Sequence, residues 1–114
     1  MNKRKELGEQ GEDLAHTYLA NKGYVLLEKN YRRKQSEIDL IMQVQTTIVF
    51  VEVKYRKSNT FGYPEEFVSA NQRRSIIEAA DYYLTLNNWG GNIRFDIIAI
   101  NARFEIEHFE DAFY

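Results

Sequence analysis

The segment from Ile48 to Lys54 limits what this chain can fold into. It reads Ile-Val-Phe-Val-Glu-Val-Lys, and a run this rich in β-branched residues predicts a strand. Side chains alternate across a strand, so the three valines share one face while Glu52 and Lys54 share the other. Valine on both sides of the charged residues indicates a strand near the centre of a sheet. A carboxylate and an ammonium group there cost free energy unless they are paired, hydrated or bound to a metal.

The same anomaly occurs in residues 36–41, Ser-Glu-Ile-Asp-Leu-Ile, where Asp39 stands among aliphatic residues. The polar residues 45–47 between the two segments predict a hairpin connection. In such a hairpin Asp39 and Glu52 approach each other on one face.

Two carboxylates and a lysine that converge in this way suit a divalent-metal phosphodiesterase. Asp39 and Glu52 would supply hard oxygen ligands, and the backbone carbonyl of Val53 would add a third. Lys54 would orient the attacking water or stabilise the transition state. The other interpretation is an ordinary exposed Glu-Lys pair on a half-solvated strand. The Glu52-Val53-Lys54 tripeptide by itself favours this second interpretation. When Asp39 is considered with it, the sequence supports the two interpretations equally.

Composition narrows the chemistry further. The chain has 114 residues, which supports one domain over residues 1–114 with a single core. It has no cysteine and only two histidines, His16 and His108, which excludes disulfides, thiol nucleophiles, thiolate zinc sites and histidine-rich metal centres. A metal site must therefore use oxygen ligands, as Mg²⁺, Mn²⁺ and Ca²⁺ do. Neither a secretory signal nor a membrane span is recognisable, so we expect a cytoplasmic protein without a membrane partner.

Hydrophobic periodicity predicts an α-β-β-β-α-β order with a short extra strand at the C-terminal end. This order describes an α/β fold with a mixed central sheet flanked by helices. The expected helices cover residues 5–22, ended by Gly23, and 71–86; the expected strands cover 24–27, 37–43, 48–55, 93–100 and 104–109, and a polar, mobile loop is expected over 56–64.

Asp39 followed by Glu52-Val53-Lys54, within this order of elements, resembles the PD-(D/E)xK, or restriction-endonuclease-like, nuclease superfamily. More closely, the chain is similar to the YraN-like family of small bacterial proteins over nearly its whole length. The matching stretches are Gly11-Glu12, Ala15, Tyr18-Leu19, Gly23, Asn30-Tyr31-Arg32, Glu37 to Ile41, Phe50 to Lys54, Gln72-Arg73-Arg74, Ala80, Tyr83-Leu84 and Arg94-Phe95-Asp96. The chain departs from the usual pattern at Ser36, Ile38 and Asn71, none of which would be a metal ligand.

This resemblance implies a core related to Holliday junction resolvases, with Mg²⁺ or Mn²⁺ held by Asp39, Glu52 and a helix-borne glutamate. Glu12 fits that role, because it lies three and seven residues before Ala15 and Leu19 and so borders the apolar face of its helix. Gln72 matches a polar position that lies beside the active site in related nucleases. The alternative for Glu12 is an ordinary solvated glutamate on a helix, and the alternative for Gln72 is an exposed helix residue.

Charge is distributed unevenly. Residues 1–60 carry eleven Lys and Arg against eight Asp and Glu, whereas residues 61–114 carry four against nine. Phosphate contact is therefore expected despite a formal net charge of -2. The expected nucleic-acid contacts are Arg32, Arg33, Arg56, Lys57, Gln72 and Arg73, with Tyr31, Tyr55 and Tyr63 as stacking partners. The other interpretation is that these charges are solvated loop ends.

The sequence thus predicts a metal-dependent endonuclease that acts on DNA rather than RNA, with branched or junction DNA and a two-fold homodimer among its expected features. One alternative is a nucleic-acid-binding module that uses the same surface without turnover. Another is a structural protein whose buried charges pair only with each other.

Overall fold

The computed structural model describes residues 3–57 and 68–113, which form two helices and a five-stranded sheet. The strands lie in the order β1-β2-β3-β4-β5, as they follow one another in the chain. The bounds are α1 Lys3–Asn21, β1 Val25–Arg33, β2 Ser36–Val44, β3 Thr47–Tyr55, α2 Ala70–Leu86, β4 Asn92–Ile100 and β5 Ile106–Phe109. This arrangement confirms the predicted fold class and order of elements. The expected loop over 56–64 lies largely outside the described residues, as does Tyr63.

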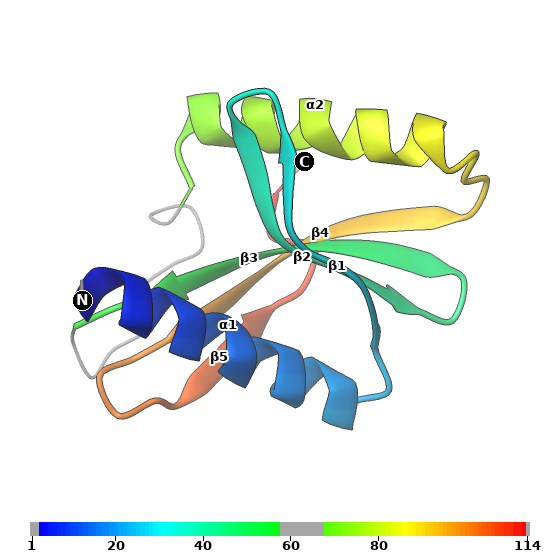
Figure 1. Cartoon of the computed structure of the whole chain (residues 1–114). Helices are drawn as coiled ribbons and strands as arrows, with labels where there is room; N and C mark the ends of the chain where they lie inside the picture. Colours follow the sequence, from blue (N-terminus) through cyan, green and yellow to red (C-terminus); the bar gives the residue numbers. More distant parts are fainter. Residues whose placement is uncertain (1–2, 58–67, 114) are drawn as a thin grey trace.

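The sheet is mixed, and helices cover both of its faces (Figure 1). β1, β2 and β3 pair antiparallel, β3 and β4 pair parallel, and β5 returns antiparallel to β4. Parallel neighbours require a crossover connection, and α2 supplies it between β3 and β4. β3 and β4 are therefore buried on both faces, which explains the nearly continuous apolar runs in their sequences.

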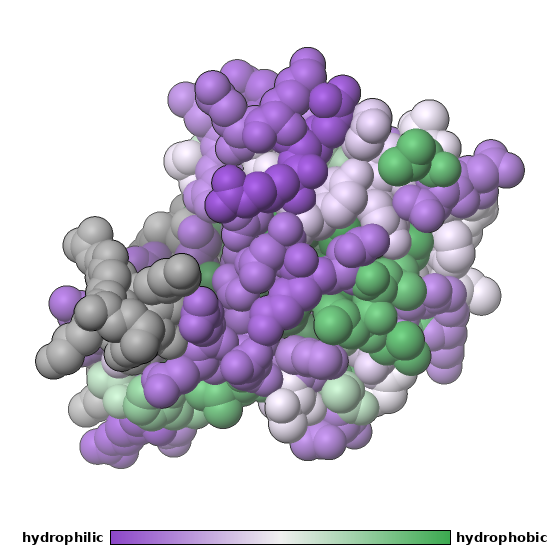
Figure 2. All heavy atoms as spheres, viewed as in Figure 1, coloured by the Kyte–Doolittle hydropathy of each residue, from purple (hydrophilic) through white to green (hydrophobic). Residues whose placement is uncertain are grey.

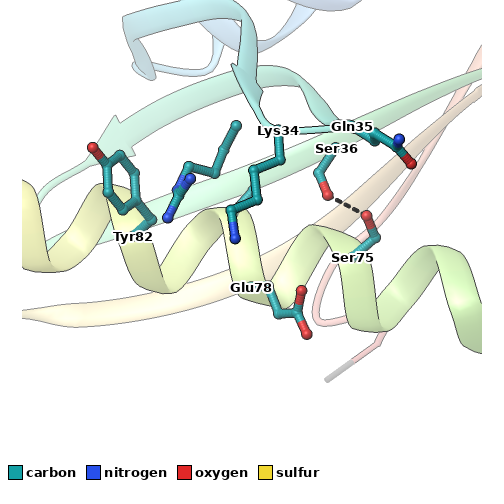
Figure 3. Close-up of a pocket in the computed structure, with 8 residues that line it drawn as sticks. Lys34, Gln35, Ser36, Ser75, Glu78 and Tyr82 are labelled. Carbon is teal, nitrogen blue, oxygen red and sulfur yellow. Dashed lines mark hydrogen bonds between the residues drawn. The ribbon is translucent and has the colours of Figure 1, made fainter.

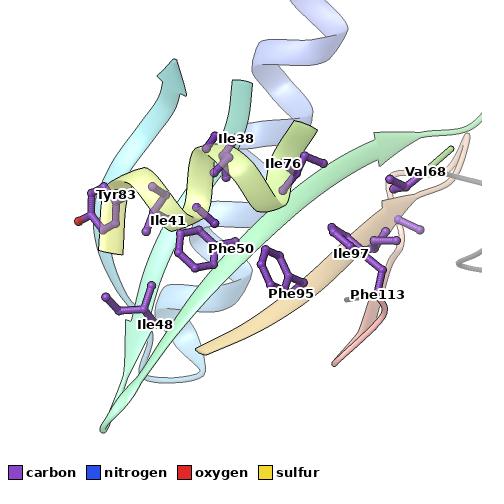
Figure 4. Packing of buried hydrophobic residues seen from close by; sticks show 13 residues of the cluster. Ile38, Ile41, Ile48, Phe50, Val68, Ile76, Tyr83, Phe95, Ile97 and Phe113 are labelled. Carbon is purple, nitrogen blue, oxygen red and sulfur yellow. The ribbon is translucent and has the colours of Figure 1, made fainter. Parts of the chain in front are cut away.

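Each face has its own hydrophobic core. On the α2 side, Phe50 stacks on Phe95 with ring centroids 5.3 Å apart, beneath Ile76 and Tyr83 of the helix (Figure 4). On the α1 side, Leu19 and its neighbours pack on the valines of β3 and on Ile98 and Ile100 of β4. The predicted alternation of residues 48–54 is confirmed, because Val49 and Val51 belong to the core on the α1 side and Phe50 to the core on the α2 side.

The helix ends follow local rules. Gly23 has φ +93°, and the N–H groups of Gly23 and Tyr24 donate to the carbonyl oxygens of Ala20 and Leu19, each at 3.0 Å. This is the hydrogen-bond pattern of a Schellman motif, which confirms the predicted stop. Ser69 caps α2, its side chain accepting a hydrogen bond from the N–H of Gln72 at 3.1 Å.

The β1–β2 hairpin is longer than the sequence suggested. The pattern predicted a strand over 24–27, whereas β1 continues to Arg33 and pairs with β2 as far as Ser36. The added residues, Glu28 to Arg33, are mostly polar and lack an apolar alternation, so their pairing depends on the partner strand. The hairpin rises out of the sheet and its tip lies next to α2 (Figure 1), where hydrophilic side chains cover it (Figure 2).

A buried charge network joins β4 to β5 and to the start of β1. Asp96 is fully buried and receives two hydrogen bonds from Arg94, each at 2.8 Å, and one from the N–H of Asp111 at 3.0 Å. His108 Nε2 lies 2.6 Å from the same carboxylate, and its Nδ1 lies 3.0 Å from Lys22 Nζ. Because Lys22 only donates, Nδ1 accepts and Nε2–H donates to Asp96.

No helix among the described residues is long and apolar enough to cross a membrane.

Replacing Asp96 by alanine should lower the free energy of unfolding by about 3 kcal/mol, because it leaves Arg94 and His108 without their shared buried partner. Urea unfolding at pH 7 measures this change. Asp81→Ala, which removes an exposed carboxylate on α2, should stay within about 0.5 kcal/mol of wild type. Equal losses in the two variants would contradict the structural role of the network.

Candidate active site

The site forms where β2 and β3 part. Their ladder runs from Val44 opposite Thr47 to Leu40 opposite Val51 and ends there. The next opposed pair in this register would be Asp39 and Glu52. At this point a side-chain oxygen replaces a backbone acceptor: Oδ2 of Asp39 accepts a hydrogen bond from the backbone N–H of Val53 at 2.8 Å. We call this point the seam.

A cleft of about 360 Å³ opens at the seam between the sheet and α2. We call it the acidic cleft. Its lining includes the predicted residues Asp39, Glu52, Val53, Lys54 and Gln72. The other lining residues are Gln35, Ser36, Glu37, Ser75 and Ile76. The structure therefore brings together in one place the two strand carboxylates, the lysine and the helix glutamine that the sequence predicted.

Glu52 is the least compensated group in the cleft. Its side chain is 4% exposed, and its Oε1 is the one buried side-chain oxygen or nitrogen among the described residues that has no hydrogen-bond partner. Burial and the neighbouring Asp39 carboxylate raise the pKa of Glu52 to about 8, while Lys54 lowers it less. A buried carboxylate in this state needs a proton or a cation.

Asp39 is shifted in the same direction by similar causes. Burial raises its pKa to about 6, the hydrogen bond from Val53 opposes this rise, and the charge of Glu12 adds to it. Both strand carboxylates thus carry negative charge at neutral pH only at a cost in free energy. A divalent cation bound to them would stabilise their ionised forms and lower their pKa values, because an opposite charge favours the ionised form.

Further acidic side chains lie next to Asp39 on the α1 side. One carboxylate oxygen each from Glu12, Glu37 and Asp39 lies within 4.8 Å of the others. Burial raises the pKa of Glu12, and Asn30 partly offsets this through a hydrogen bond. Glu12 and Glu37 also line a second cleft of about 390 Å³ beside the β1–β2 hairpin.

Helix α1 lies against the sheet next to Glu12. A Cβ atom at Gly11 would lie 3.4 Å from Ile100 Cδ1 and 3.7 Å from Val53 Cγ1, which are ordinary van der Waals distances. Glu12, the next residue, thus lies close to β3 and β4.

Sequence reasoning missed Glu37. It lines both clefts, and Arg32 Nη2 lies 2.8 Å from its Oε2. The available signal was its position two residues before Asp39, which places both on the same face of a regular strand. Glu37 resembled an ordinary exposed strand residue because nothing in the sequence showed that it would lie beside Glu12 of α1.

The donor set fits a hard divalent cation. Glu12, Glu37 and Asp39 form a group of oxygen ligands. Glu52 lines the same cleft as Asp39 and adds a buried Oε1 that has no hydrogen-bond partner among the described residues. Lys54 lines the same cleft and adds one positive charge.

The predicted nucleic-acid contacts are distributed over several places. Arg32 forms its ion pair with Glu37, and Arg33 lies over the ring of Tyr82 at 4.0 Å from the centroid. Neither the acidic cleft nor the second cleft includes Arg56, Lys57 or Arg73 in its lining.

Two of the tyrosines expected as stacking partners, Tyr31 and Tyr55, contact other aromatic rings of the chain. Tyr31 lies edge-on to Tyr83, with centroids 5.1 Å apart, and Tyr55 lies against Phe104 at 6.0 Å. Neither tyrosine lines the acidic cleft.

The raised pKa of Glu52 predicts a pH-dependent stability in the presence of a chelator. The folded chain retains a proton that the unfolded chain releases near pH 4.5, so the free energy of unfolding falls as the pH rises from about 4.5 to about 8. Glu52→Gln should remove much of this fall. At pH 8.5 its free energy of unfolding should exceed that of the wild type by on the order of 1–3 kcal/mol.

Urea unfolding at pH 4.5 and at pH 8.5, with EDTA, measures this difference. Glu107→Gln, which neutralises an exposed carboxylate on β5, should leave the pH dependence as in wild type. The same fall in Glu52→Gln as in wild type would contradict the assignment of the shift to Glu52.

Comparison with known proteins places these residues in a family. Residues 11–100, which include Glu12, Asp39, Glu52, Lys54 and Gln72, match the "Uncharacterised protein family UPF0102". The chain is 47% identical to a UPF0102 protein of Chlorobium chlorochromatii, over 99% of this chain and 95% of that protein. It is 45% identical to one of Thermodesulfovibrio yellowstonii (97% and 98% covered) and 47% identical to one of Clostridioides difficile (96% and 97% covered). The resemblance to the YraN-like proteins is therefore confirmed, and the chain belongs to the UPF0102 family.

Proposed function

We propose that the protein is a divalent-metal-dependent endonuclease that hydrolyses phosphodiester bonds in DNA. The observation that carries the proposal is the buried carboxylate of Glu52, whose Oε1 has no hydrogen-bond partner among the described residues, in an open cleft that also holds Asp39 and Lys54. A purely structural carboxylate would be satisfied by neighbouring donors, as Asp96 is. The resemblance to PD-(D/E)xK nucleases and junction resolvases supports the same reaction and adds branched DNA to the substrates to be tested.

Asp39 and Glu52, together with the backbone carbonyl of Val53, would hold Mg²⁺ or Mn²⁺, and Glu12 and Glu37 extend the donor set on the α1 side. A metal bound there would lower the pKa of a coordinated water and neutralise charge that develops on the phosphate.

The residues of the chain have distinct parts in this proposal. The N–H of Val53 fixes one oxygen of Asp39, which leaves Oδ1 free to face a cation. The Lys54 ammonium group is a positive donor for a phosphate oxygen or for the attacking water. Gln72, on the opposite wall of the cleft, offers an amide that can hold the substrate backbone.

We expect the purified protein to cleave at least one member of a panel of single-stranded, duplex and four-way DNA in Mn²⁺ or Mg²⁺. Asp39→Asn and Glu52→Gln should each lower the rate at least about a hundredfold by removing a ligand, and Lys54→Met should do so by removing the positive charge. Gel-resolved single-turnover cleavage measures these rates.

Glu107→Gln and Arg103→Ala are the matched controls, because each removes an exposed charge outside the acidic cleft. Both should cleave at the wild-type rate. If the protein binds DNA without cleaving it, and Glu52→Gln binds DNA as well as or better than wild type, the nuclease proposal is wrong. The protein is then a non-catalytic nucleic-acid-binding module that uses the same surface.

A further inference from the structure

A third depression lies next to the acidic cleft, between the tip of the β1–β2 hairpin and α2 (Figure 3). We call it the hairpin groove, and its volume is about 410 Å³. Its residues from the hairpin are Arg33, Lys34, Gln35 and Ser36, and those from α2 include Ser75, Glu78 and Tyr82. Gln35, Ser36 and Ser75 also line the acidic cleft, so the two depressions are adjacent.

A hydrogen bond between the hydroxyl groups of Ser36 and Ser75 fixes the hairpin to α2 where the groove meets the cleft (Figure 3). The hairpin and the helix are thereby held as two walls. The enclosed volume is typical of a site that surrounds one small ligand or a few groups of a chain. A base-paired double helix would have to lie across such a groove rather than within it.

The positive charge of the hairpin is concentrated on this groove. Lys29 is paired with Asp13 at 2.7 Å and Arg32 with Glu37 at 2.8 Å, both outside the groove. Arg33 and Lys34 form no ion pair with any residue in the described part of the chain. Two cations that form no ion pair within the described residues, next to the proposed site of phosphodiester hydrolysis, suit the phosphate of a neighbouring nucleotide.

The groove also offers a stacking surface. The Arg33 guanidinium group lies 4.0 Å from the centroid of the Tyr82 ring, and the Tyr82 side chain is 42% exposed. Planar guanidinium and aromatic groups are the surfaces on which proteins stack unpaired bases. Glu78, on the same wall, is an acceptor for base amino groups.

We propose that the hairpin groove binds an unpaired segment of the nucleic-acid substrate. In this arrangement the scissile phosphate lies in the acidic cleft, an adjacent phosphate meets Lys34, and a base stacks on the Arg33–Tyr82 pair. The inference rests on the proposed nuclease function and narrows its substrate to DNA that contains a single-stranded stretch at the cleavage site.

Fluorescence anisotropy with a labelled 15-nucleotide oligo-dT strand and a duplex of equal length tests this inference. The full-length Asp39→Asn protein in Mg²⁺ prevents cleavage and still provides an acceptor for the N–H of Val53. We expect the single strand to bind more tightly than the duplex. Adding Tyr82→Ala should weaken single-strand binding at least about fivefold, whereas Tyr82→Phe should not.

Arg33→Ala with Lys34→Ala should also reduce the salt dependence of single-strand binding by more than about one unit of slope. Arg103→Ala, an exposed cation in the β4–β5 turn, should leave it unchanged. Tighter duplex binding, no single-strand binding, or affinity that is insensitive to Tyr82 would overturn the inference, whether or not the wild type cleaves DNA. If single-strand binding depends on Tyr82 but the protein cleaves no DNA, the proposed nuclease function is rejected and the proposed binding role of the hairpin groove is supported.

Discussion

The hydrogen bond from the N–H of Val53 to the Asp39 carboxylate determines how the rest of the site is built. It occupies the place where the next ladder bond between β2 and β3 would form. Because a side-chain oxygen accepts this hydrogen bond, the β2 backbone is free to leave β3, and the β1–β2 hairpin rises toward α2 (Figure 1). The departure of one strand opens the acidic cleft, exposes the Glu52 side of β3 to it, and creates the wall of the hairpin groove.

Two buried carboxylates on neighbouring strands show the difference between a structural and a candidate functional acid. Asp96 on β4 is surrounded by donors from Arg94, His108 and the backbone, and these hydrogen bonds lower its pKa despite complete burial. Glu52 on β3 is almost as buried but faces another carboxylate, and its pKa rises. The same sheet therefore compensates one negative charge with its own side chains and leaves the other to an external cation or proton.

The order of the elements and the core of the site could be predicted from the sequence because they depend on local patterns. Alternation in residues 48–54 located Glu52, and the hairpin implied by residues 36–47 located Asp39 opposite it. The length of β1 could not be predicted, because Glu28 to Arg33 form a strand only through pairing with β2. Glu37 and Tyr82 were missed because their contacts are tertiary: Glu37 lies beside Glu12 of α1, and the rise of the hairpin brings Arg33 to Tyr82 of α2. The expected single domain, the cytoplasmic location and the dimer stay predictions.

The central claim is that Asp39 and Glu52 form a divalent-cation site whose ligands are partly protonated without the metal. Isothermal titration of the wild-type protein with Mn²⁺ at pH 7, in two buffers of different ionisation enthalpy, tests it most directly. We predict saturable binding that releases protons, because a carboxylate with a raised pKa must lose its proton to bind a metal. We predict that Asp39→Ala abolishes the binding. No binding by the wild type, or equal binding and no proton release in both proteins, would contradict the claim.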